Sequence, residues 1–460
     1  MLENLHFKID KFCPRKTIHS LLIFLLKCSF FLVILLLFQI YSLRSILNSP
    51  PPPPPPPPLK PPSRCDAGLV YVYDLPPAFN ADLLRNCHDL DPWISKCNTL
   101  SNAGFGPRAT SLPAMPEGLT SSWYWTDMFA AEVMYHARIM KHECRTTEPQ
   151  SATAFYIPFY AGVAVGKYLF TNRNYTARDR DYQCEDMLTW LKDQPPWRRS
   201  NGSDHFILLG RMTWDFRRRG DEDWGSSFVY MPVMKQIVRL TVERDPWDHR
   251  EISVPYPTGF HPKSKLEVDQ WVDFVTSRNR TSLFTFVGAK RNKIKDDFRS
   301  LLLSYCYNET GSCRVVDCSG SRCYKGTPEI QEAFLGSDFC LQPRGDAHTR
   351  RSTFDCMLAG SIPVFFWRRS IEHQYELFLG DEPDRFSVFI DWKDVRNGLS
   401  IRKVLEGYSR EEVRRMREKV ISLIPNFIYG DGNGIGKDAF DIATDGVIKK
   451  IKEQNESNMR

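Results

Sequence analysis

Four residues in the C-terminal half of the chain, Arg350, Arg351, Ser352 and Asp355, have types and a spacing that suit the binding of an anion. The first three fall at the predicted start of a short helix, where free N–H groups and the positive end of the helix dipole attract negative charge. The two guanidinium groups add paired N–H donors, so the cluster suits a diphosphate. Asp355, one turn further along, suits hydrogen bonds from a ribose diol. An isolated Arg-Arg-Ser would be interpreted more simply as part of a surface helix with ordinary ion pairs. The sequence on either side of the cluster distinguishes an anion site from such a surface helix.

The segment around these residues predicts the elements that would present them. A strand is expected over residues 339–341, a loop over 342–349, a helix over about 350–359 and a second strand over 362–366. Gly360 is the expected stop of the helix. Parallel sheets bind ligands at the loops that leave the carboxyl ends of their strands, so this order of elements favours a binding site over a surface helix.

Short apolar strands alternate with helical stretches elsewhere in the chain, which is typical of a parallel sheet with crossovers. Residues 122–141 predict a long helix, because apolar side chains recur there at helical spacing. A segment rich in proline, residues 254–262, separates two such alternations, so the sequence predicts an α/β protein whose two domains meet near residue 265. Strands are expected over 69–73, 152–158, 205–209 and 283–287.

Motifs spread over most of residues 69–450 carry a family resemblance. They are, in chain order, Tyr71-Val-Tyr-Asp-Leu-Pro76, Phe159-Tyr-Ala-Gly162, Gly210-Arg-Met-Thr-Trp-Asp-Phe-Arg-Arg218, Val254-Pro-Tyr-Pro257, Phe286-Val-Gly288, Phe339-Cys-Leu-Gln-Pro343 and Thr349-Arg-Arg-Ser352. Together they resemble the exostosin-like glycosyltransferases of family 47, and within that family the plant xyloglucan galactosyltransferase branch.

The resemblance implies a GT-B fold, in which two Rossmann-like domains face each other across a cleft. Residues 65–265 would form the acceptor-side domain, residues 266–450 the nucleotide-sugar-binding domain, and residues 451–460 a tail. The implied enzyme inverts the anomeric carbon by direct displacement and transfers galactose from UDP-galactose to xyloglucan side chains in cell-wall biosynthesis. UDP-galacturonate, UDP-arabinose or another wall polysaccharide would be alternative substrates of the same fold.

Such a displacement needs positive groups that stabilise the departing nucleoside diphosphate. Arg350, Arg351 and Ser352 at the predicted helix start meet this requirement, with Asp355 for the ribose and two further arginines. These are Arg344, in the loop before the predicted helix, and Arg291, after the strand that is expected over 283–287.

The reaction also needs a base that removes the proton of the acceptor hydroxyl. Asp215 is the predicted base, because it follows an expected strand of the first domain and would lie at the mouth of the cleft. An ion pair of Asp215 with Arg217 or Arg218 is the competing interpretation.

Two other classes of protein have to be weighed. Asp221 and Asp223 match the D-x-D pattern with which GT-A enzymes hold manganese, but they follow three arginines and a glycine instead of an apolar strand. We interpret them as a solvated loop and expect no obligatory metal or cofactor besides the UDP-sugar substrate. A carbohydrate-binding or adhesion protein without catalysis would stack Trp123, Trp125 and Trp214 on sugar rings. UDP binding distinguishes a glycosyltransferase from such a carbohydrate-binding protein, because the latter does not need a nucleotide.

The N-terminal region holds most of the net charge of +6. Residues 64–460 carry 54 basic and 53 acidic residues, so the large region is nearly neutral and a nucleic-acid partner is not expected.

Residues 21–43 have Lys27 as their one charge and are long enough to cross a hydrocarbon core of about 30 Å. Basic residues precede this span, so the positive-inside rule predicts a cytosolic tail over 1–20 and a lumenal bulk. A cleaved signal peptide is the alternative, but no A-x-A-like site follows the span.

Eleven prolines between residues 50 and 62 predict a semi-rigid polyproline II stem within residues 44–64. The expected location is therefore the Golgi membrane, as a single-pass type II protein. Polysaccharide acceptors and complexes with other Golgi glycosyltransferases are the expected partners.

Sequons and cysteines beyond the predicted span agree with a lumenal location. N-glycosylation is expected at Asn174, Asn201, Asn279, Asn308 and Asn455. Eleven cysteines lie beyond the span, and in an oxidising compartment they are disulfide candidates with at least one left unpaired. The cysteines between 306 and 323 lack C-x₂-C pairs, so disulfides are preferred there to a zinc site.

Overall fold

The computed structural model describes residues 26–27, 29–41, 65–91, 94–110, 112, 115–169, 175–221, 224–291, 294–320, 323, 327–432 and 434–459. The chain divides into two units, Met1–Pro62 and Ser63–Arg460.

In the first unit, residues 26–27 and 29–41 are helical and their apolar side chains are exposed. Within the described part of the chain, no helix has both the length and the hydropathy that a membrane crossing requires. The predicted tail over 1–20, the stem over 44–64 and both ends of the predicted span lie outside the described residues.

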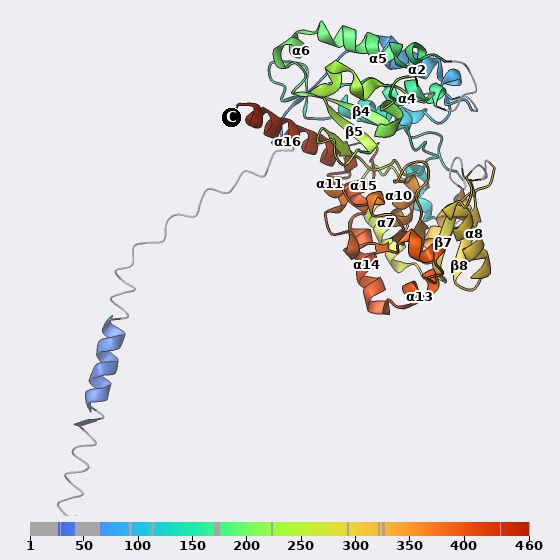
Figure 1. Ribbon diagram of the computed structural model, residues 1–460. Coiled ribbons are helices and arrows are strands. Elements are labelled where there is room, and N and C mark those ends of the chain that lie inside the picture. The colour runs from blue at the N-terminus through green and yellow to red at the C-terminus, as the bar shows by residue number, and fades with distance from the viewer. Residues whose placement is uncertain are drawn as a thin grey trace, which may run out of the picture. The chain divides into compact units, whose positions relative to one another are not determined.

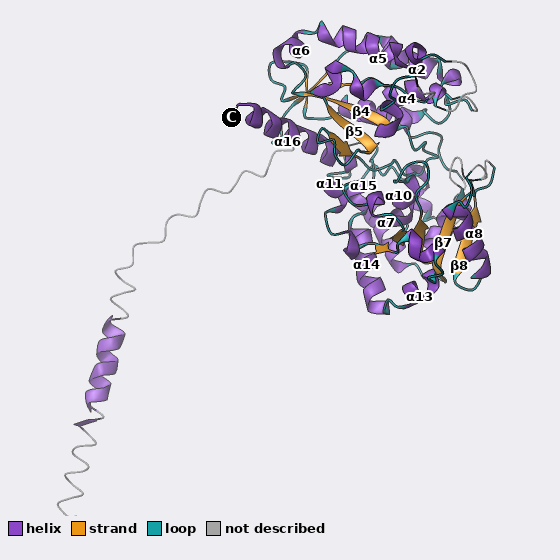
Figure 2. Ribbon diagram, viewed as in Figure 1, coloured by secondary structure: helices purple, strands orange, loops and turns teal. Residues whose placement is uncertain are grey.

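The second unit contains two parallel sheets, drawn in orange in Figure 2. The first sheet has six strands in the order β2-β1-β3-β4-β5-β6, and every neighbouring pair is parallel. Its strands are β1 (Val70–Val72), β2 (Arg145–Thr146), β3 (Ala154–Ile157), β4 (His205–Met212), β5 (Val238–Glu243) and β6 (Glu251–Ser253).

Both faces of this first sheet are buried, as the near-continuous apolar run of β4 predicts. Phe206 and Leu208 pack in one core cluster with α3, whereas Ile207 and Leu209 pack in another with α5. Helix α5 is labelled in Figure 1. The helices of this half are α2 (Ala81–Arg85), α3 (Ala131–Ile139), α4 (Ala161–Val165), α5 (Ala177–Lys192) and α6 (Pro195–Ser200).

A buried carboxylate joins two of the family motifs in this half. Glu132 of α3 accepts hydrogen bonds from the backbone N–H groups of Gly162 (2.6 Å), Val163 (3.0 Å) and Gly210 (3.0 Å). It therefore caps the first turn of α4 and fixes the position of β4.

The second sheet has five parallel strands in the order β11-β10-β9-β7-β8. They are β7 (Ser282–Gly288), β8 (Cys313–Asp317), β9 (Ser337–Gln342), β10 (Ile362–Phe365) and β11 (Val388–Phe389). The predicted boundary at residue 265 falls between the two sheets. The helices of this half are α7 (Lys265–Ser277), α8 (Phe298–Asn308), α9 (Pro328–Leu335), α10 (Arg351–Leu358), α11 (Glu376–Leu379), α12 (Trp392–Arg396), α13 (Ile401–Glu406), α14 (Arg410–Ser422) and α15 (Ile424–Phe427).

The C-terminal helix α16 (Ala439–Met459) returns to the first half, where it packs against β5 (Figure 1). Residues 451–459, predicted as a tail, are the last turns of this helix.

The predicted long helix over 122–141 is wrong in its first half. A 3₁₀ segment, Glu117–Ser122, is followed by extended backbone, and α3 begins only at Ala131. Trp123 forms a β-bridge with Phe260, and the N–H of Tyr124 donates to the carbonyl of Gly259 at 2.9 Å. These long-range backbone partners replace the helical ones, which periodicity cannot reveal.

Disulfides confirm the cysteine prediction. The pairs are Cys65–Cys144, Cys87–Cys97, Cys306–Cys313, Cys318–Cys323 and Cys340–Cys356. Cys184 is free and buried. Cysteines 306–323 therefore form two disulfides and leave no thiolate for zinc.

Four of the five predicted N-glycosylation sites are described. Asn201, Asn279 and Asn308 are exposed, and Asn455 on α16 is partly exposed. Asn174 lies outside the described residues.

Candidate active site

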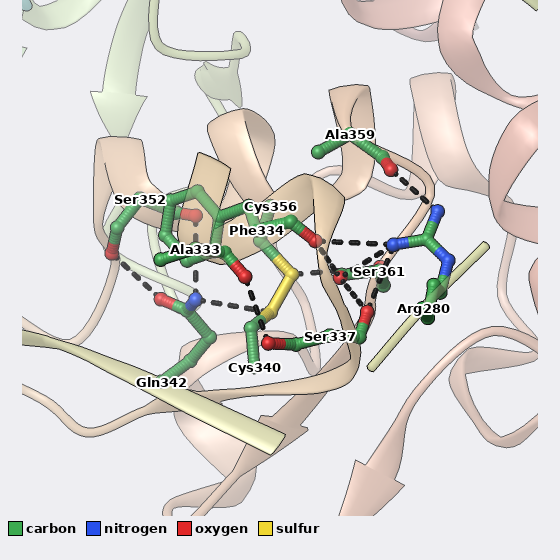
Figure 3. The surroundings of a disulfide bond; sticks show 10 residues. All are labelled: Arg280, Ala333, Phe334, Ser337, Cys340, Gln342, Ser352, Cys356, Ala359 and Ser361. Atoms are coloured by element: carbon green, nitrogen blue, oxygen red, sulfur yellow. Dashed lines mark hydrogen bonds between the residues drawn. A yellow bond between two sulfur atoms is a disulfide. The ribbon is translucent and has the colours of Figure 1, made fainter. Parts of the chain in front are cut away.

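The helix that carries the predicted anion-binding residues is α10, and its first turn is tied to strand β9 (Figure 3). The disulfide Cys340–Cys356 links the strand to the helix. Ser352 Oγ donates to Gln342 Oε1 at 2.7 Å, and Gln342 Nε2 donates to the carbonyl of Ser352 at 3.3 Å. The predicted strand, helix and second strand correspond to β9, α10 and β10, and the predicted stop, Gly360, follows the helix with φ +69°.

The other end of α10 is held by a largely buried arginine. Arg280 Nη2 donates to the carbonyl of Ala359 at 2.7 Å, and its Nη1 donates to the carbonyls of Phe334 (3.1 Å) and Ser337 (2.8 Å) (Figure 3). The same Nη1 also donates to the carbonyl of Leu335 at 3.2 Å. Burial lowers the pKa of Arg280 to about 9, which still leaves the guanidinium charged at neutral pH. A positive charge at the carboxyl ends of α9 and α10 complements both helix dipoles.

A cavity of about 240 Å³ opens beside the first turn of α10. Arg351, Ser352 and Asp355 line it from the helix, and Gly288 lines it from the carboxyl end of β7. Arg299 of α8 adds a second guanidinium. The remaining walls are mainly apolar and include Trp123, Tyr124, Trp125 and Met128 of the first half and Ile330, Gln331 and Phe334 of α9.

Three of the six residues predicted to bind the donor thus meet at one cavity. Arg351 Nε donates to Asp355 Oδ2 at 3.0 Å, and its Nη1 donates to the carbonyl of Thr126 in the first half. Burial raises the pKa of Asp355, and the neighbouring Arg351 opposes that shift. The pair fixes the guanidinium at the start of the helix, where the N–H groups and the dipole also favour an anion.

The other three predicted donor residues lie in or beside the loop between β9 and α10. The Arg350 guanidinium packs so closely on Gly345 that a Cβ there would overlap it, and burial lowers the pKa of Arg350. Arg344 lies over the ring of Trp367 at 5.1 Å. Arg291 pairs with Asp346. None of these three arginines lines the 240 Å³ cavity.

Two residues of this region were missed by sequence reasoning. Arg299 could have been found as a basic residue in the first turn of the helix that follows β7. Glu243, the last residue of β5, is fully buried. Its carboxylate accepts hydrogen bonds from Trp214 Nε1 (2.7 Å), the N–H of His348 (3.2 Å), and both the N–H (2.7 Å) and hydroxyl (2.6 Å) of Thr349. It therefore joins the first sheet to the loop that leads into α10.

The predicted base, Asp215, is buried and is not among the described residues that line the 240 Å³ cavity. It is 1% exposed, its Oδ2 accepts a hydrogen bond from Arg211 Nε at 2.8 Å, and burial raises its pKa. Both predicted ion-pair partners were wrong: Arg217 pairs with Asp248 and Glu251, and Arg218 pairs with Asp181. The role of Asp215 as base stays a prediction, and this geometry does not favour it.

The three tryptophans of the carbohydrate-binding interpretation do not lie at one site. Trp123 and Trp125 line the 240 Å³ cavity. Trp214 instead stacks with the guanidinium of Arg369 at 5.0 Å, and Trp247 lies on the same guanidinium at 4.8 Å. Of the predicted D-x-D loop, Asp221 is described and Asp223 lies outside the described residues.

Comparison with known proteins agrees with the resemblance that the motifs carry. The exostosin GT47 domain model matches residues 64–405. The chain is 59% identical over 396 residues to xyloglucan galactosyltransferase XLT2 of Arabidopsis thaliana, which covers 85% of this chain and 76% of that protein.

Two further Arabidopsis thaliana relatives are more distant. Xyloglucan galactosyltransferase MUR3 is 39% identical over 84% of this chain, and xyloglucan-specific galacturonosyltransferase 1 is 37% identical over 85%. The chain spans 63% and 58% of the lengths of these two relatives. With a family model that matches most of its length and a relative of this identity, the chain belongs to the exostosin GT47 family.

Proposed function

We propose that this protein is an inverting glycosyltransferase that transfers galactose from UDP-galactose to xyloglucan side chains. The 59% identity to a xyloglucan galactosyltransferase supports both the donor and the acceptor. The observation that carries the donor site is the meeting of Arg351, Ser352 and Asp355 with Arg299 at one cavity beside the start of α10.

The chemistry of that cavity suits a nucleoside diphosphate. Arg351 and Arg299 supply positive charge, and the first turn of α10 supplies N–H groups, for the charge that develops on the departing diphosphate. Oδ1 of Asp355 accepts no hydrogen bond from the described residues, so it is available to a ribose hydroxyl. The apolar walls suit the flat base. Two parallel sheets, with the donor cavity at the carboxyl end of the second, support a GT-B arrangement.

Galacturonate is the second candidate sugar, because one relative of 37% identity is a xyloglucan-specific galacturonosyltransferase. A galacturonosyl group adds a carboxylate to the donor, and a cavity with two guanidinium groups has the charge to accept it. The donor assay therefore needs both nucleotide sugars.

The experiment incubates the full chain with UDP-galactose, UDP-galacturonate or UDP-arabinose and xyloglucan oligosaccharides. We expect transfer from UDP-galactose, with the configuration of the new linkage opposite to that in the donor. Absence of transfer from every donor would contradict the proposed activity, and transfer of galacturonate alone would replace the proposed sugar.

The proposed location is the Golgi membrane, with residues 21–43 as a type II anchor and the second unit in the lumen. Five disulfides within the second unit support an oxidising compartment. The exposed sequons test this location. Treatment of the plant-expressed protein with an endoglycosidase should lower its mass, and Asn279→Gln should remove one glycan. A protein without any glycan would contradict the lumenal location.

A further inference from the structure

A second cavity, of about 250 Å³, lies at the C-terminal end of α3. It is lined on one side by α3 and the loop that contains Phe105, and on the other side by residues between α15 and the start of α16. Lys141 and Asp431, both exposed, stand among its lining residues, so the cavity opens to solvent. None of the predicted site residues lines it.

The main polar feature of this cavity is Arg138, which is only 9% exposed. Its Nε, Nη1 and Nη2 atoms are all buried and donate no hydrogen bond to any described residue. The nearest carboxylate oxygens, Oδ2 of Asp438 and Oδ2 of Asp441, are 3.8 Å and 3.7 Å from Nη2, beyond hydrogen-bond distance. A guanidinium has five N–H donors, and burying such a donor without an acceptor is unfavourable. Apart from these two ion pairs, the N–H donors of Arg138 are not used by any described residue.

The charges around the cavity do not select an anion. Arg138 and Lys141 are offset by Asp431 and Asp438. The carboxylate of Asp438 also already accepts backbone hydrogen bonds on both oxygens, from Gly430 at 2.9 Å and from Asp441 at 3.1 Å. What remains unused is a set of N–H donors without net positive charge around them. A neutral ligand with several hydroxyl oxygens satisfies such donors, as ordered waters do.

Aromatic rings complete the lining. Phe105, Tyr429 and Phe440 contribute to the walls, and the Arg138 guanidinium lies 5.6 Å from the centre of the Phe440 ring. A pocket of apolar walls with a few convergent polar groups is the usual form of a small-ligand site. Its volume corresponds to about eight water molecules at ~30 Å³ each, which is room for one sugar ring and its hydroxyls.

The second cavity is close to the donor cavity. The ring of Phe105 lies 5.4 Å from the ring of Tyr124, which lines the donor cavity, and stacks on His261 at 4.0 Å. Thr126, whose carbonyl accepts a hydrogen bond from Arg351, also bonds His261 Nε2 through its hydroxyl at 2.8 Å. One layer of side chains thus separates the two cavities.

We propose that this second cavity binds one sugar unit of the polysaccharide acceptor, away from the unit that reacts, with the unpaired N–H groups of Arg138 donating to its hydroxyls. This inference rests on the proposed function, since it takes the acceptor to be a glycan. It assigns to Arg138 and the aromatic walls a role in acceptor affinity and none in donor binding or chemistry.

The test compares two variants of the full chain with a matched control on the same helix. Ala137→Trp places a bulky ring at the lining of the cavity without removing a charge, and Arg138→Gln removes most of the N–H donors. Met140→Trp adds the same ring at a position that is 41% exposed and does not line the cavity. Calorimetry measures the affinity for a xyloglucan oligosaccharide without donor, and separately the affinity for UDP.

We expect both cavity variants to weaken oligosaccharide binding at least tenfold and to raise KM for the acceptor, with UDP affinity and melting temperature retained by Ala137→Trp. Met140→Trp should match the wild type in all measurements. Unchanged oligosaccharide affinity in Ala137→Trp would overturn the proposal even if Arg138→Gln fails to fold. Displacement of the oligosaccharide by inorganic phosphate through Arg138 would also overturn it, in favour of an anion site. A wild type that binds the oligosaccharide but transfers no sugar would contradict the proposed function and leave this site standing.

Discussion

The buried carboxylate of Glu243 offers a sharp test of how the two sheets position the donor site. It joins the end of β5 to the loop before α10 and receives four hydrogen bonds. Trp214 and His348 donate to Oε1, and Thr349 donates twice to Oε2. The change Glu243→Gln keeps the shape of the side chain but replaces one acceptor oxygen with an NH₂ group, which can only donate.

The cost follows from the two ways in which the amide can be oriented. With its NH₂ group toward Trp214 and His348, two buried N–H donors lose their acceptor. With its NH₂ group toward Thr349, the threonine hydroxyl can turn and accept, so only the backbone N–H of Thr349 is left unpaired. The second orientation is cheaper. One unpaired buried N–H costs about 1–3 kcal/mol, and loss of the negative charge weakens the remaining bonds, for a total of about 2–4 kcal/mol.

This free energy converts to a measurable change in melting temperature. A unit of about 400 residues has an unfolding entropy of roughly 0.8 kcal/mol/K, at ~2.1 cal/mol/K per residue, so the melting temperature should fall by about 2–5 °C. The affinity for UDP should fall as well, because His348 and Thr349 lead directly into the first turn of α10.

A matched control is Glu251→Gln. Glu251 is also fully buried and accepts hydrogen bonds from Thr213 Oγ1 (2.6 Å), Arg217 Nη2 (2.7 Å) and the N–H of Asp245 (2.8 Å), all within the first half. We expect it to lower the melting temperature without changing UDP affinity. The reasoning is refuted if Glu243→Gln has the same melting temperature as the wild type, or if both variants change UDP affinity equally.

Three further changes test the donor site and its supports. Arg351→Ala should weaken UDP binding by about 10- to 100-fold, the equivalent of one charge-assisted contact, whereas Arg415→Ala, an exposed arginine of α14, should leave calorimetric affinity unchanged. Cys340→Ser should cost about 3 kcal/mol of stability for a loop of about 15 residues and also weaken UDP binding, whereas Cys87→Ser should lower stability alone. Burial raises the pKa of Glu132 to about 7. The carboxyl group therefore binds its proton more tightly in the folded protein than in the unfolded chain. Its contribution to stability is present below about pH 4.5 and falls as the pH rises to about 7. The stability lost in Glu132→Gln should therefore be smaller at about pH 7.5 than at about pH 5, and an equal loss at both would contradict the raised pKa.

Local signals in the sequence were sufficient for the elements around α10. Apolar runs and a glycine stop predicted a strand, helix and strand within one or two residues of β9, α10 and β10. The side-chain spacing also placed Arg351, Ser352 and Asp355 together, because residues three and four apart share one face of a helix.

Long-range contacts account for what the sequence could not predict. Arg350 is adjacent to Arg351 but precedes the helix, so its extended backbone directs it onto Gly345 instead of into the cavity. Asp215 follows its strand as expected, yet its carboxylate pairs with Arg211, near the end of that same strand. Glu243 and the partners of Trp123 belong to segments about one hundred residues or more apart, and no periodicity reports such pairs.

The supports of α10 explain how so short a helix can serve as an anion site. Eight residues are too few for a helix to be stable in isolation, so its first N–H groups would be poorly ordered without external contacts. The Ser352–Gln342 bonds hold its start on β9, the disulfide holds its second half on the same strand, and Arg280 binds the carbonyl that ends it. Because these contacts are made before any ligand arrives, the N–H groups and Arg351 need little reorganisation when a diphosphate binds. Arg280 itself lies outside the cavity. Arg280→Met should therefore weaken UDP binding as well as lower the melting temperature. If the variant loses stability but binds UDP as the wild type does, the start of the helix is ordered without Arg280.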